Sequence, residues 1–191
     1  MKNFILIIFL FSINIGYSQI NLDNKKISEA ALSIVDPNIL YDGRYQTIDY
    51  PNGDVSSSIG VCTDVVIRSL RKLGIDLQKL IHEDMKNNFS EYPQFWGNDG
   101  PDKNIDHRRV YNQMKFFSRM GNEIEISDSP IYYLPGDIVA WNLGGNTTHI
   151  GVIVSKKSLD NLRHMVVHNI GLGQVLEDIL FDYKIIGHYR F

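Results

Sequence analysis

The spacing of the apolar residues changes partway along the chain, and this change constrains the fold more than any other feature. Up to about residue 120 apolar side chains recur every three or four positions, as on one face of a helix, whereas beyond about residue 135 they alternate as in strands. The helical segments are 27–35, 62–73, 77–88 after an Asp76 cap, and 107–120; the strand segments are 138–143, 149–155, 165–170 and 184–191. Helices followed by antiparallel strands predict an α+β fold.

The first eighteen residues have the pattern of a secretory signal. Lys2 supplies a positive charge, residues 4–11 are almost all apolar, and Gly16 and Ser18 are small residues placed for cleavage. We therefore predict a signal peptide over 1–18 and a single domain over 19–191, exported to the periplasm or the extracellular space. The apolar run is shorter than the ~20 residues of a spanning helix, and no cysteine stands directly after the cleavage site, so we expect neither membrane insertion nor a lipid anchor.

The net charge of the chain indicates which classes of partner it can attract. With 22 acidic and 19 basic residues the net charge is -3, so the chain has no basic field that would gather phosphates. We expect no nucleic-acid partner and no attraction to a membrane surface. The sequence says nothing of protein partners.

Cys62 is the only cysteine of a chain that we expect in an oxidising compartment, so it cannot form an internal disulfide. The simplest interpretation of a lone cysteine is a small buried apolar residue. Cys62, however, begins a predicted helix, where the dipole favours a thiolate by ~0.3–2 kcal/mol. Lowering a thiol pKa by two or three units takes roughly 3 to 4 kcal/mol, so ionisation near neutral pH would require a nearby imidazolium.

Two of the six histidines, His149 and His168, lie in predicted strands. Alternation places His149 on one face with Gly151, whose missing side chain would let the start of the cysteine helix approach the sheet. His168 lies between apolar residues and needs a polar partner. Each alone is most simply a structural histidine, but together with Cys62 they favour catalysis: His149 would take the thiol proton, His168 would orient the His149 ring, and the Cys62 backbone N–H would stabilise an oxyanion.

Several strings of the sequence resemble a bacterial domain-of-unknown-function family within the NlpC-type superfamily of papain-like cell-wall hydrolases. They cover most of the chain from about residue 27 to 191 and read YPNGDV, GVCTDVVIR, GIDLQKLIHEDM, NIDHRRV, PGDIVAW, HIGVIVS, VVHNIG and GHYR. The order of cysteine before histidine is similar to the unpermuted branch of that superfamily. Tyr111 departs from the family pattern, where we expect proline more often.

The resemblance implies a fold in which N-terminal helices pack on a small antiparallel, barrel-like sheet, with Cys62 facing the sheet across a cleft. It implies Cys62 as nucleophile, His149 as base and His168 as the orienting residue. The implied activity is that of an amidase or endopeptidase that cleaves amide bonds of peptidoglycan peptides without a cofactor.

The NIDHRRV string is a second candidate for contact with substrate. Asp106, His107, Arg108 and Arg109 could form a lip of the site, with one of the arginines binding a substrate carboxylate in bidentate fashion. An equally good interpretation is a helix N-terminus with Asp106 as its cap and solvated arginines.

Four other residues have simpler interpretations. We expect Asp64 to stabilise the first turn of its helix, and Asp137, after Pro135 and Gly136, to be a turn residue. Trp96 and Trp141 are expected to pack in the protein, although Trp96, in an aromatic loop, could instead line a groove.

Two alternatives to an enzyme stay open. Cys62, His149 and His168, with His107 or His188, could bind zinc, although no two of them have the close spacing common in zinc sites. The chain could also be a wall-binding module without turnover, but such a binder needs none of the three proposed catalytic residues.

Overall fold

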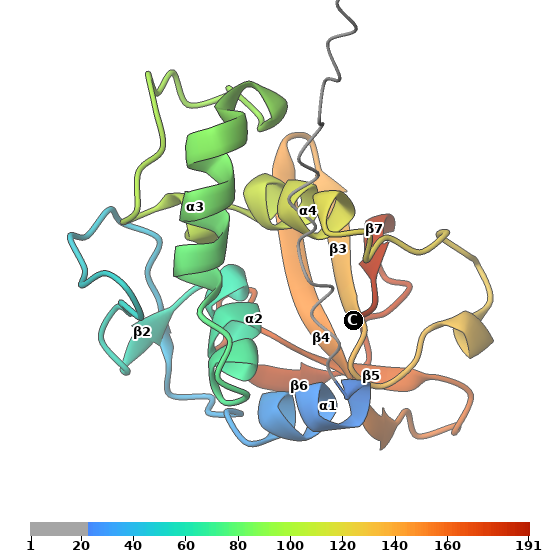
Figure 1. The fold of residues 1–191 in the computed structure, drawn as a ribbon. Coiled ribbons are helices and arrows are strands. Elements are labelled where there is room, and N and C mark those ends of the chain that lie inside the picture. The colour runs from blue at the N-terminus through green and yellow to red at the C-terminus, as the bar shows by residue number, and fades with distance from the viewer. Residues whose placement is uncertain (1–22) are drawn as a thin grey trace, which may run out of the picture.

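The computed structural model describes residues 23–191, which form an α+β domain, as predicted. The helices lie in the first part of the chain and the main sheet in the second (Figure 1). The helices are α1 (Asn24–Leu32), α2 (Cys62–Arg71), α3 (Leu77–Asn88) and α4 (Val110–Arg119), with short 3₁₀ helices η1 (Phe89–Glu91), η2 (Asp106–Arg108) and η3 (Pro130–Tyr132). The predicted signal peptide lies outside the described residues, and no helix within 23–191 is long and apolar enough to cross a membrane.

The main sheet has five strands in the order β6-β5-β4-β3-β7, and every neighbouring pair is antiparallel. Its strands are β3 (Ile138–Gly144), β4 (Thr147–Lys157), β5 (His164–His168), β6 (Val175–Glu177) and β7 (Lys184–Tyr189). A separate parallel pair joins β1 (Leu40–Tyr41) to β2 (Ile59–Gly60). The sequence analysis missed β1, β2 and β6, because strands of two or three residues are too short to show a period.

Side-chain caps explain where the helices start. Asp76 accepts a hydrogen bond of 3.1 Å from the Lys79 N–H, as predicted for the N-cap of α3. Asp23 does the same for α1 through Lys25, so this helix begins at Asn24 and not at residue 27. The last predicted helix also starts elsewhere, at Val110, because residues 106–108 form the 3₁₀ helix η2 and a break follows it.

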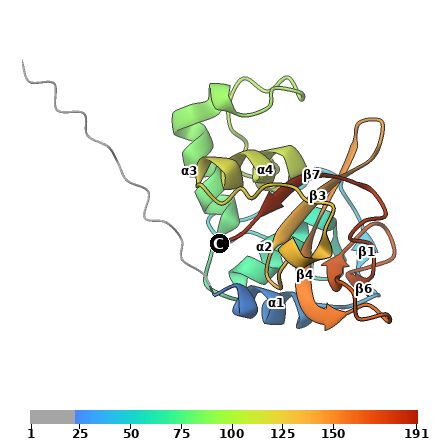
Figure 2. The same cartoon turned by 90° about the vertical axis from the view of Figure 1, so that its right-hand side faces the viewer.

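Two apolar clusters lie on opposite faces of the sheet. The larger one joins α1, α2 and α4 to one face of β4, whose Ile150, Val152 and Val154 are fully buried there. The smaller one contains Trp141 and Ile153 on the other face. Figures 1 and 2 show the helices gathered along one side of the strands, with α3 farthest from the sheet. Strand alternation therefore works as predicted, and Trp141 packs in the core.

Candidate functional site

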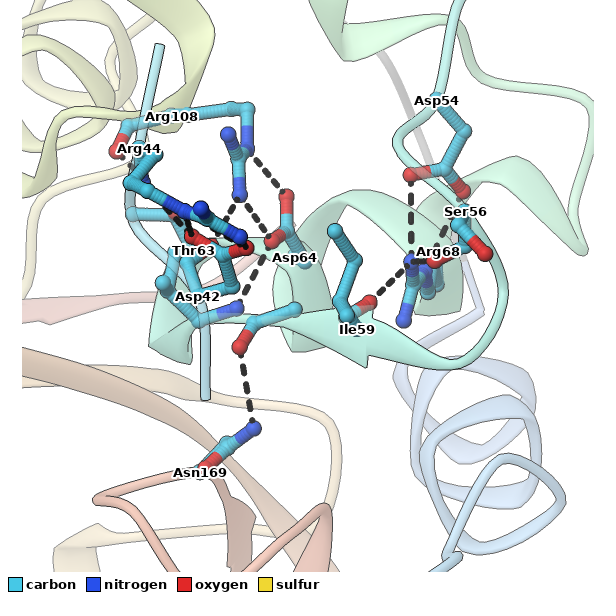
Figure 3. A network of polar contacts seen from close by, with 12 residues as sticks. Asp42, Arg44, Asp54, Ser56, Ile59, Thr63, Asp64, Arg68, Arg108 and Asn169 are labelled. Atoms are coloured by element: carbon cyan, nitrogen blue, oxygen red, sulfur yellow. Dashed lines mark hydrogen bonds and ion pairs between the residues drawn. The ribbon is translucent and has the colours of Figure 1, made fainter. Parts of the chain in front are cut away.

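Cys62 is the first residue of α2, and its position brings the thiol to the edge of β4. Sγ accepts a hydrogen bond from the backbone N–H of Ile150, the residue after His149. Two residues before Cys62, the carbonyl of Gly60 accepts a bond of 3.3 Å from Asn169, the residue after His168 (Figure 3). The start of α2 is thus held beside both strands that carry the predicted catalytic histidines.

The two histidines contact each other directly. Nε2 of His149 lies 3.1 Å from Nδ1 of His168, with the rings nearly perpendicular at 89°. On the other side of His168, Nε2 lies 2.9 Å from a carboxylate oxygen of Glu177 on β6. The distance is short, but the direction of the contact does not meet the geometry of a hydrogen bond. The side chains form a row from β6 through β5 to β4: Glu177, His168 and His149.

The short contact with Glu177 favours one pair of tautomers for the two rings. A carboxylate has no proton to give, so a neutral His168 carries its proton on Nε2, facing Glu177, and offers Nδ1 as acceptor. His149 then donates from Nε2, which leaves its Nδ1 with a free lone pair. That nitrogen can take a proton, which is the property a general base needs.

Gly151 makes this arrangement possible, but in a different way from the one predicted. A Cβ atom at Gly151 would lie 2.8 Å from Cγ1 of Val166 and 3.1 Å from Cβ of His168. The space beside His149 therefore admits β5 and the His168 side chain, and it does not serve the approach of the cysteine helix.

The protonation of the site differs from the expected thiolate. Burial raises the pKa of Cys62 to about 12, with a further rise from the Asp64 charge that is opposed by backbone N–H groups. Burial, with a contribution from His168, lowers the pKa of His149 to about 3. Cys62 is 5% exposed, and neither ring is among the groups that hydrogen-bond its sulfur in residues 23–191. The expectation of an ionised thiol is wrong for this state, in which burial keeps both the thiol and the imidazole neutral.

Asp64 and Arg108 form a buried ion pair under the start of α2. The guanidinium donates to both carboxylate oxygens at 2.9 and 2.8 Å, and the two side chains are only 1% and 2% exposed (Figure 3). Asp64 also accepts a bond of 2.7 Å from the backbone N–H of Val61. It is therefore a first-turn acid, as predicted, and in addition the anchor between α2 and η2.

The predicted substrate lip is not on the surface. Asp106, His107 and Arg108 are 1%, 2% and 7% exposed, and Arg108 is committed to Asp64. Asp106 accepts from the backbone N–H of Asp102 and caps no α-helix, contrary to the alternative interpretation. Burial, with a contribution from nearby arginines, lowers the pKa of His107 to about 4.

Arg109 is the most exposed of the four predicted lip residues, although its side chain is only 16% exposed. Its guanidinium donates to Asp106 at 3.1 Å and lies 4.0 Å from the centre of the Trp96 ring. Substrate contact by Arg109 stays a prediction.

The proposed zinc ligands do not converge. His188 lies on β7 and contacts the buried Asp137 at 2.8 Å, and His107 lies in η2. Within residues 23–191 no group of three or more histidine, cysteine, aspartate or glutamate residues is arranged to hold a metal ion.

Asp137 is more than the predicted turn residue, because it also accepts two hydrogen bonds from Arg190, at 2.7 and 2.6 Å.

Two residues near the site were not found from the sequence. Glu177 lies in the short strand β6, where no motif distinguishes it from a surface carboxylate. Tyr41 lies opposite Gly60 in the β1–β2 pair. Burial, followed by the charges of Cys62 and Asp64, raises the pKa of Tyr41 to about 12. The influence of these two residues indicates that the phenol lies near the start of α2. Glu177 and Tyr41 are recognised as residues near the candidate site only from their neighbours in the folded protein.

The fold and the site define an α+β domain in which the start of a helix brings a lone cysteine to the strands of two bonded histidines. The chain belongs to the family described as Domain of unknown function (DUF1287), whose model matches residues 28–191. It is 46% identical over 168 residues to the "Uncharacterized protein YijF" of Escherichia coli (strain K12), and the match covers 88% of this chain and 82% of that protein. No solved structure matches the chain. The predicted membership of a domain-of-unknown-function family is confirmed.

Proposed function

We propose that this protein is an exported cysteine amidase or endopeptidase with an NlpC-like, papain-type site, in which Cys62 is the nucleophile, His149 the base and His168 the orienting residue. The observation that carries the proposal is the row from Glu177 through His168 to His149, which leaves an unprotonated ring nitrogen on His149. The next residue along the strand, Ile150, contacts the Cys62 sulfur through its backbone N–H. A buried structural histidine pair has no need of a neighbouring thiol.

The neutral pair suggests general-base catalysis. In the proposed reaction Sγ attacks the carbonyl carbon of a scissile amide, and the thiol proton passes to Nδ1 of His149 once Cys62, which here packs with Ile150 and Val152, has approached the ring. The positive charge that forms on His149 is stabilised through His168 by Glu177. The backbone N–H of Cys62 stabilises the tetrahedral oxyanion. Collapse breaks the C–N bond, and the leaving amine takes the proton from His149. Water, deprotonated by the same nitrogen, then hydrolyses the thioester and restores the thiol.

The proposed substrate is the peptide part of peptidoglycan. The resemblance of the GVCTDVVIR, HIGVIVS and VVHNIG strings to NlpC-type cell-wall hydrolases supports this class, and so does the predicted signal peptide over 1–18, which would deliver the protein to the compartment of the cell wall.

The test is digestion of purified peptidoglycan followed by mass spectrometry of the released muropeptides. The wild-type protein should release fragments, and Cys62→Ala and His149→Ala should each abolish release while keeping the circular dichroism spectrum. His164→Ala is the matched control, because His164 begins the same strand that His168 ends, and it should keep activity. Equal fragment release by wild type and Cys62→Ala would refute the proposal.

A wall-binding module is the second candidate. The high pKa of Cys62, about 12, favours it, because a thiol that stays protonated is a weak nucleophile in the free protein. Sedimentation with insoluble peptidoglycan, without release of any fragment by the wild-type protein, would support binding alone.

A further inference from the structure

An aromatic cavity lies next to the proposed catalytic strand. It has a volume of about 430 Å³ and is lined by Phe95, Trp96, Tyr111, Asn146 and Thr148. These residues come from three separate parts of the chain: the loop after η1, the start of α4 and the β3–β4 hairpin. Cavities of ~300–1,000 Å³ with aromatic walls and a few polar groups are typical of small-ligand sites.

The aromatic rings are held in place although they are open to solvent. Phe95 and Trp96 are 70% and 40% exposed. The Phe95 ring contacts Trp96 at 5.7 Å and Tyr111 at 5.3 Å between centroids, both edge-to-face. Arg109 covers Trp96 and is itself bound to Asp106. Three rings that contact one another and line an open cavity form a platform for the flat face of a ligand.

The polarity of the lining restricts the ligand. Asn146 and Thr148 supply an amide and a hydroxyl, and no lining residue is charged. A neutral ligand with apolar ring faces and amide or hydroxyl groups fits this combination. A carboxylate or an amine would lose hydration without a charged partner in the lining, since the nearby Arg109 is already paired with Asp106. An N-acetylated sugar has these features.

One wall of the cavity lies on β4, close along the strand to the proposed nucleophile. Thr148 directly precedes His149, and it lies two residues from Ile150, whose N–H bonds the Cys62 sulfur. At ~3.3 Å per residue this separation along the strand is roughly 7 Å. A sugar bound in the cavity could therefore be linked to a peptide whose amide bond, one or two residues away from the sugar, reaches the Cys62 sulfur.

We propose that this cavity binds an N-acetylated sugar of the glycan that carries the peptide to be cleaved. The inference rests on the proposed function in that it makes the substrate a glycan-linked peptide and not a free one. Its rings then act as a binding platform, apart from the catalytic side chains.

Binding can be measured without any turnover. The probe is tetra-N-acetylchitotetraose, titrated into full-length Cys62→Ala protein while tryptophan fluorescence is followed, because Trp96 is 40% exposed and Trp141 is fully buried. We expect saturable binding that Phe95→Ala and Tyr111→Ala each weaken by roughly threefold to tenfold. Tyr132→Ala is the control, since Tyr132 is 60% exposed and outside the cavity, and it should bind as before.

Two results would overturn the inference. One is no binding of the oligosaccharide to protein that remains folded; the other is binding that Phe95→Ala and Tyr111→Ala leave unchanged. The proposed function can fail separately: if wild-type protein releases no muropeptide but the sugar binds in the cavity, the sugar site stands and the hydrolase does not. If cleavage occurs and free stem peptide is cut as efficiently as glycan-linked peptide, the sugar site is refuted and the hydrolase stands.

Discussion

Removing the charge of Arg108 should destabilise the protein far more than removing that of a surface arginine. Arg108→Met leaves the Asp64 carboxylate in place with its side chain 1% exposed and without its partner. Loss of one partner from a buried ion pair costs ~3–5 kcal/mol, a large share of the ~5–15 kcal/mol by which a domain is usually stable. For a domain of this size each kcal/mol lowers the melting temperature by ~2–4 °C, so the expected decrease is roughly 6 to 20 °C.

Urea denaturation followed by circular dichroism measures this cost. The matched control is Arg163→Met, because Arg163 also pairs with an aspartate in bidentate fashion, at 2.7 and 2.6 Å, but both side chains are about 30% exposed. The control should change the unfolding midpoint little, since exposed pairs contribute little. The double variant Arg108→Met with Asp64→Asn should lose less than the two single losses added together, because no uncompensated charge remains. Equal midpoints for Arg108→Met and Arg163→Met would refute the reasoning.

Three further predictions concern the row of side chains that ends at His149. Glu177→Gln should lower kcat for muropeptide release by up to ~10²-fold with KM unchanged, because His168 loses the negative charge that stabilises its protonated form and faces an amide that can also donate. The neighbouring Asp178→Asn should keep kcat, and equal losses would contradict this role. Gly151→Ala should reduce activity more than stability, since its Cβ would meet the His168 side chain at 3.1 Å; full activity in a kinetic assay would disprove the need for that space. Burial lowers the pKa of His149 to about 3, so below pH 6.5 the unfolded chain takes up a proton that the folded chain does not. The free energy of unfolding should therefore fall as the pH is lowered from about 6.5 to 3. His149→Gln should flatten this dependence by up to ~1.4 kcal/mol per pH unit in urea titrations at several pH values, and an unchanged slope would show that other groups cause it.

The elements with a clear period were predictable from the sequence. α2 and α3 begin where the cap and the apolar spacing place them, and β3, β4, β5 and β7 follow from alternation. The short strands were not predictable, because two or three residues carry no period and their pairing depends on distant segments.

The sequence placed the two histidines on adjacent strands correctly, but it did not predict the protonation of the candidate site. His149 bonds to His168, and Cys62 lies beside Ile150, the residue after His149, so the catalytic set that the resemblance implies stays a prediction. The predicted thiolate failed because the spacing of residues along a sequence does not show how deeply the folded protein buries them, and burial favours the neutral forms of both groups. For the same reason Arg108 looked like a surface ligand and lies beneath α2.

The single cysteine makes the dynamics of the site measurable. Because Cys62 is 5% exposed and has no other thiol beside it in the chain, an alkylating reagent reaches the sulfur only during excursions that uncover it. Intact-mass spectrometry would then show one adduct per molecule, and its time course would give the frequency of those excursions. A molecule bound at the site would lower the rate of alkylation of Cys62. The alkylation rate can therefore be used to screen for ligands of the site before any substrate is known.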